Sequence, residues 1–65
     1  MVKMFDERDR VEVTWVDEDD IAQGIKVGMK GTIMAVPSVG PVIVDIDDYP
    51  IERYMVRGQL KVIEV

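Results

Sequence analysis

Hydrophobic and polar residues alternate with a period of two over several short stretches of the chain. In the two clearest stretches, the apolar positions that share a face are Val11, Val13 and Trp15, and then Val42, Val44 and Ile46. Such alternation is typical of β-strands that bury one face. The pattern predicts five short strands, at about 9–16, 29–36, 41–47, 53–57 and 61–65.

Turn-forming residues separate these predicted strands. A long connection after the first strand opens with the acidic run DEDD at 17–20 and contains the only helical candidate, which Gly24 interrupts. Three shorter breaks follow, namely PSVGP at 37–41, DDYP at 47–50 and RGQ at 57–59. We expect a hairpin loop, a strand end at Pro50 (which cannot donate to a ladder) and a single tight helical turn, respectively.

Three glycines stand in the run GIKVGMKGTIMAV, residues 24–36, which otherwise favours a strand. The strands of a small barrel must bend sharply, and such bends fall at glycines or bulges. We predict that Gly31 shares a face with Ile33 and bends over the core, that Gly28 begins the strand, and that Gly24 is a loop residue with positive φ. Five short strands then curl into a single small all-β barrel.

The composition limits the number of domains and the chemistry. A chain of 65 residues forms one domain with a small core, and it contains no cysteine or histidine. This excludes disulfide scaffolds and zinc fingers. No apolar run approaches the ~20 residues of a membrane helix, and the start MVKMFDERDR does not resemble a signal peptide. We expect one cytoplasmic domain over residues 1–65, with 1–8 as a flexible or edge segment and with no membrane partner.

The order of the predicted elements resembles the SH3-like barrel over nearly the whole chain, from Asp9 to Val65. The strings that carry the resemblance are DRVEV at 9–13, GMKGTIMAV at 28–36, PVIVDID at 41–47 and YMVRGQLKVI at 54–63. They are similar to strings in small bacterial and phage-encoded SH3-like proteins, and residues 28–46 are similar to the KOW motif. The resemblance implies a five-stranded barrel and a role in binding or assembly. An OB-like barrel is the alternative fold.

Acidic residues outnumber basic ones by thirteen to eight, which gives a net charge of −5. Seven of the acids lie in DEDD at 17–20 and DIDD at 45–48. Carboxylates are ligands for calcium and magnesium, but Gly28 stands where an EF-hand loop starting at Asp17 requires glutamate. We therefore expect solvated loop charge and no metal. If the two loops converge, they form an acidic face that suits a basic protein surface.

These features predict a non-catalytic module that binds or inhibits a host partner protein, of a type that a phage or prophage could encode. The residues expected to carry the binding are Trp15, Asp17, Glu18, Asp19, Asp20, Asp47, Asp48, Tyr49 and Tyr54. Trp15 has two interpretations: a packing residue that covers one end of the barrel, or an exposed anchor of the kind enriched at interfaces. We expect no enzyme and no cofactor, because neither Ser38 nor Thr14 has an evident base to activate it.

Two alternatives remain open. A KOW-like nucleic-acid or ribonucleoprotein accessory domain would use the four cations Lys26, Lys30, Arg53 and Arg57, although the negative net charge disfavours phosphate binding. A homo-oligomer would close its subunit contact with four apolar side chains, namely Met4, Phe5, Ile25 and Met34. Retention of oligonucleotides at low salt tests the first alternative, and light scattering tests the second.

Overall fold

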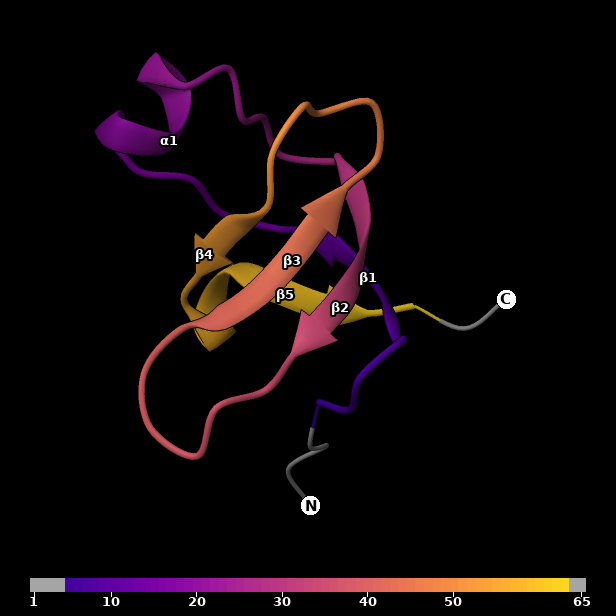
Figure 1. Ribbon diagram of the computed structural model, residues 1–65. Coiled ribbons are helices and arrows are strands. Elements are labelled where there is room, and N and C mark those ends of the chain that lie inside the picture. Colours follow the sequence, from indigo (N-terminus) through magenta and orange to yellow (C-terminus); the bar gives the residue numbers. More distant parts are fainter. Residues whose placement is uncertain (1–4, 64–65) are drawn as a thin grey trace.

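The computed structural model describes residues 5–63, which form a five-stranded antiparallel sheet that curls strongly into a half-barrel (Figure 1). The strands are β1 (Arg10–Val13), β2 (Lys30–Ala35), β3 (Val42–Ile46), β4 (Arg53–Met55) and β5 (Leu60–Val62). A short helix, α1 (Glu18–Ala22), lies between β1 and β2, and a 3-10 turn, η1 (Arg57–Gln59), joins β4 to β5. The prediction of a small all-β fold with five strands is confirmed, and the arrangement is consistent with an SH3-like fold.

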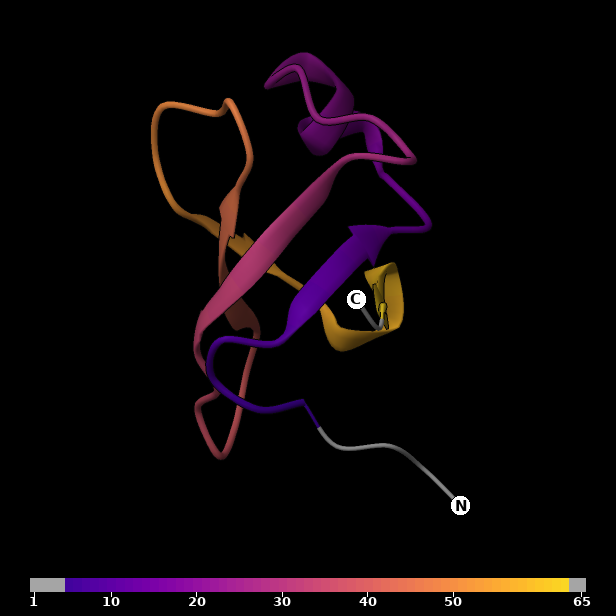
Figure 2. The ribbon, with the colours of Figure 1, turned by 90° about the vertical axis from the view of Figure 1, so that its right-hand side faces the viewer.

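The strands follow the order β4-β3-β2-β1-β5 across the sheet, and every neighbouring pair is antiparallel. Within residues 5–63 no ladder joins the two edge strands, β4 and β5, which are linked through η1 instead. Figure 2 shows from the side how the sheet curls around its inner face. The predicted barrel is therefore a half-barrel, whose core is enclosed by the curl and the connections rather than by a closed ladder.

The core fills the inside of the curl. Its buried side chains are Val11, Val13, Ile25, Ile33, Val42, Val44, Ile46, Met55 and Leu60. All of them except Ile25 come from strands, at the alternate positions that the sequence pattern indicates. Burying a side chain of this size contributes about 1.5–3 kcal/mol, so this cluster is the main source of stability.

Two of the three glycine predictions are confirmed. Gly31 is buried, and a Cβ atom there would lie 2.7 Å from the backbone oxygen of Asp45, so only glycine permits this approach of β2 to β3. Gly24 has a φ of +86°, as expected of a loop residue. The expectation that Gly28 begins the strand is wrong, because β2 starts at Lys30 and Gly28 has a φ of +96°.

The predicted strands are too long at several ends. β1 ends at Val13 rather than at 16, because the chain leaves the ladder there and turns towards α1. β4 ends at Met55 rather than at 57, because Arg57 already belongs to η1, the helical turn that the sequence predicts. Residues 1–4 of the expected N-terminal segment and 64–65 of the expected last strand lie outside the described residues. Within that N-terminal segment, the N–H of Arg8 donates to the oxygen of Ile33 at 2.7 Å.

Candidate functional site

Helix α1 begins at a capping box formed by two of the predicted site residues. An Asp17 carboxylate oxygen accepts from the N–H of Asp20 at 2.9 Å, and an Asp20 oxygen accepts from the N–H of Asp17 at 3.2 Å. Glu18 and Asp19 fill the first turn, where negative charge is stabilised by the helix dipole. The DEDD run therefore folds as a helix start, and Glu18 and Asp19 are its solvated acids.

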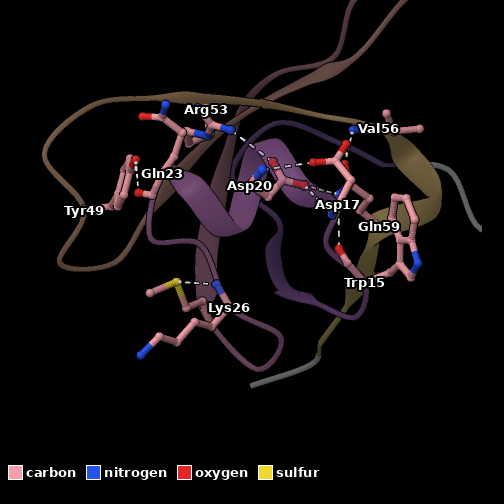
Figure 3. A network of polar contacts seen from close by, with 10 residues as sticks. Trp15, Asp17, Asp20, Gln23, Lys26, Tyr49, Arg53, Val56 and Gln59 are labelled. Atoms are coloured by element: carbon pink, nitrogen blue, oxygen red, sulfur yellow. Dashed lines mark hydrogen bonds and ion pairs between the residues drawn. The ribbon is translucent and has the colours of Figure 1, made fainter.

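Asp20 is buried, unlike its neighbours in α1 (Figure 3). Gln59 Nε2 donates to Asp20 Oδ2 at 2.6 Å, and Arg53 Nη2 donates to Asp20 Oδ1 at 3.0 Å. Burial raises the pKa of Asp20, but hydrogen bonds from Gln59, from the Asp17 backbone and from Arg53 outweigh it and lower that pKa below its ordinary value of 3.8. Asp20 is thus an ionised internal acceptor rather than a surface contact.

Gln59 connects three parts of the chain through its side-chain amide. Its Nε2 also donates to the backbone oxygen of Trp15 at 3.1 Å, and its Oε1 accepts from the N–H of Val56 at 3.1 Å. The backbone of Gln59 accepts from the N–H of Thr14 at 2.8 Å. These contacts fix the main chain on both sides of the Trp15 side chain, although residues 14 and 15 lie beyond the end of β1.

The Trp15 side chain is 56% exposed, and the nearby Val56 is 61% exposed. Figure 3 shows Trp15, Val56 and Asp17 around Gln59. The indole is not part of the buried core, and its exposure favours the anchor interpretation over the packing one. We name this group of residues (Trp15, Val56 and the acidic helix start 17–19) the Trp15 surface.

The second acidic loop lies at the same end of the molecule as α1. The Tyr49 hydroxyl donates to the backbone oxygen of Gln23 at 2.7 Å, and Figures 1 and 2 both place the connection 47–52 at the same end as α1. Asp47 forms an ion pair with Arg10, with 2.6 Å between Asp47 Oδ2 and Arg10 Nη2, and this hydrogen bonding lowers the pKa of Asp47. The two loops therefore converge, but part of their negative charge is compensated.

The other residues predicted to bind a partner protein lie in different surroundings. Asp48 occupies a turn with a φ of +63°. Tyr49 packs partly buried against the core, whereas Tyr54 is 67% exposed on β4, opposite Ile43. Trp15, Tyr49 and Tyr54 thus belong to three separate environments.

The four cations of the nucleic-acid alternative are divided between two roles. Arg53 is bound to Asp20, and Arg57 donates to the backbone oxygens of Gly40 at 2.5 Å and Pro37 at 2.7 Å. Both arginines therefore hold the fold together. Lys26 and Lys30 are exposed.

The expectation that Ile25 helps to close a subunit contact is wrong. Ile25 is 1% exposed and belongs to the core, because the chain after α1 turns inward at this position. Phe5 packs partly buried against the core, Met34 is 47% exposed, and Met4 lies outside the described residues.

No family model matches this chain, and no curated protein or solved structure matches it either. The site is therefore interpreted from its own geometry. In the part of the chain that the structure describes, no three side chains of the metal-ligating types are grouped to hold an ion. No helix over residues 5–63 has the length and apolar character to cross a membrane.

Sequence reasoning missed Gln59, the residue that organises this region. Its partners Asp20 and Trp15 lie 39 and 44 positions away in the chain, so no local pattern links them. The one available signal is a polar side chain in the RGQ turn, directly before the last predicted strand.

Proposed function

We propose that this protein is a non-catalytic interaction module that binds a partner protein through the Trp15 surface. The single observation that carries the proposal is the 56% exposure of Trp15 on a main chain fixed by Gln59. A main chain that is already held in place loses little conformational freedom on binding, and tryptophan is enriched among the residues that dominate interface energies.

The charge of the Trp15 surface indicates the chemistry of the partner. Glu18 and Asp19 are exposed in the first turn of α1, three and four positions after Trp15 in the chain, and within residues 5–63 no ion pair neutralises them. A partner with an apolar pocket for Trp15 and basic side chains around it would complement both features. Rim charges of this kind act mainly on the rate of association, so we expect binding to weaken as the salt concentration rises.

The resemblance to small bacterial and phage-encoded SH3-like proteins supports the same kind of role. SH3-like barrels serve several roles, and binding and assembly are among them. One form of the proposal is stoichiometric binding to a host enzyme that blocks its activity.

The test is affinity capture followed by measurement of binding to the purified partner. We expect Trp15→Ala to weaken the complex by about thirtyfold or more, since hot-spot truncations cost about 2 kcal/mol or more. Replacing both Glu18 and Asp19 by their amides should slow association and reduce its dependence on salt.

Met34→Ala is the matched control, because it removes an exposed apolar side chain of β2 that lies outside the Trp15 surface. Equal binding by Trp15→Ala and wild type would contradict the proposal. Equal losses in Trp15→Ala and Met34→Ala would also contradict it, because the effect would then not be specific to this surface.

The nucleic-acid alternative stays a prediction. Two of its four cations, Arg53 and Arg57, are engaged in contacts within the chain. Lys26 and Lys30 are left to meet phosphate against a net charge of −5, and this balance is why we favour the protein partner.

A further inference from the structure

Residues 17–24 are attached to the half-barrel in an unusual way. Within the described residues, the apolar core and the hydrophobic side chains packed against it include none from this segment. Asp20 is the single buried residue of α1, and Ile21 is 62% exposed. The segment therefore lacks the apolar packing that normally holds a helix to a sheet.

Three side-chain hydrogen bonds join this segment to the rest of the molecule. Asp20 accepts from Arg53 of β4 and from Gln59 of η1, and the backbone oxygen of Gln23 accepts from the Tyr49 hydroxyl. All three are polar. Water can replace such contacts when the segment moves away, at much lower cost than exposing an apolar core.

We propose that residues 17–24 form a flap that opens from the half-barrel as a unit while the sheet stays folded, with Asp20 as the latch that closes it. This inference goes beyond the binding role of Trp15 and does not depend on it.

Internal contacts hold the flap together. The N–H groups of Ile21, Gln23 and Gly24 donate to the oxygens of Asp17, Asp19 and Ile21, at 3.0, 3.1 and 3.0 Å. The capping box adds two further bonds at the helix start. A helix of five residues does not keep such bonds alone in water, so they open together once the outer contacts of the segment break.

The ends of the flap are suited to act as hinges. Val16, just before it, and Ile25, just after it, pack against or within the core and fix the two attachment points. Gly24 has a φ of +86°, and a Cβ atom there would meet nothing within 4 Å, so the chain can turn at this position.

Opening would change what the molecule presents to a partner. The guanidinium of Arg53 and the amide of Gln59, which now enclose the Asp20 carboxylate, would become accessible. Arg53 Nε is buried with no hydrogen-bond partner in the closed state, so the latch leaves one donor unused.

Native-state hydrogen exchange followed by NMR tests the flap in the wild-type protein. The amides of Ile21, Gln23 and Gly24 should share one opening equilibrium, with protection factors within about threefold of one another. They should exchange at least tenfold faster than the hydrogen-bonded sheet amides of Val13 and Ile33. Low concentrations of denaturant should leave their exchange unchanged, because little surface is exposed.

Variants then test the latch. Asp20→Ala should speed exchange of the flap amides at least tenfold, and the sheet amides, which exchange only on global unfolding, should remain at least tenfold more protected than the flap amides. Asp19→Ala is the matched control, since it removes an exposed carboxylate from the same helical turn. If Asp20→Ala fails to fold, Tyr49→Phe removes one hydroxyl, keeps the ring, and should speed the flap amides severalfold.

Two results would overturn the inference. One is exchange of flap and sheet amides together, at a single rate and with the same denaturant dependence, since the segment would then open only on global unfolding. The other is an equal effect of Asp20→Ala and Asp19→Ala on the flap amides, since the buried carboxylate would then not be the latch.

Discussion

At the scale of single residues, a few side chains with no role in the apolar core decide the local geometry. Gln59 binds Asp20, Trp15 and Val56 through one amide group. It therefore connects η1 both with the chain before α1 and with α1 itself. An amide is suited to this position because it donates and accepts at the same time. Neither a carboxylate nor an aliphatic side chain could make all of these bonds.

Gly31 is the residue where a single added methyl group is most informative. Its Cβ would lie 2.7 Å from the Asp45 backbone oxygen and 2.9 Å from Val44 Cγ1, and a backbone atom in a ladder cannot move aside easily. We expect Gly31→Ala to lower the free energy of unfolding by about 1–3 kcal/mol, as overpacking does. Urea unfolding measures this difference.

Gly58→Ala provides the comparison for that experiment. A Cβ at Gly58 meets nothing within 4 Å, so this substitution should change stability by less than about 0.5 kcal/mol. Equal stabilities of the two alanine variants would show that the approach of β2 to β3 does not require glycine.

At the scale of elements, the sequence predicted the strands and turns whose positions follow from a local residue pattern. The alternation of Val42, Val44 and Ile46 located β3, and RGQ at 57–59 located η1. The extent of β1 was overestimated, because Trp15 continues the apolar alternation of that strand even though the chain has already left the ladder. The alternation describes which residues could share a face, whereas the strand ends where its hydrogen-bonded partner ends.

The candidate site shows the same limit. The acidic loops and Trp15 were visible as patterns, but the burial of Asp20 was not, because its partners Arg53 and Gln59 lie 33 and 39 residues away. A run of four acids gives no sign that one of them points inward. Tertiary contacts of this kind separate the structural members of the run from the solvated ones.

Asp20 in α1 makes the free energy of unfolding depend on pH. The pKa of Asp20 is lower in the folded protein than its ordinary value of 3.8, so its contribution is fully present above about pH 4 to 5. That contribution is lost as the pH falls through the folded pKa. We expect the stability difference between wild type and Asp20→Asn to be large at pH 7 and to shrink below about pH 4.

Chemical denaturation of both proteins at pH 7, 5 and 3 measures this difference. Asp19→Asn should stay within about 1 kcal/mol of wild type at every pH, because Asp19 is exposed in the same helix and its charge gains only the small stabilisation of the helix dipole. A difference between wild type and Asp20→Asn that stays constant down to pH 3 would mean that the Asp20 carboxylate is not stabilised by its neighbours.

At the scale of the whole molecule, the half-barrel builds one core from alternate strand positions and Ile25. Trp15 and Val56 are two of the large apolar side chains that it leaves exposed, and Trp15 precedes the acidic helix start in the chain. The overall charge of −5 was evident from the sequence, but the approach of the two acidic loops, which the Tyr49–Gln23 contact joins, required the fold.

The chain contains one tryptophan, so collisional quenching of its fluorescence by acrylamide reports on Trp15 alone. Quenching in the folded protein should reach about half of that in the urea-unfolded chain, in line with the 56% exposure, and should fall severalfold when the captured partner is bound. An indole already protected in the free protein, or one equally quenched with and without the bound partner, would contradict the role of the Trp15 surface as the docking site.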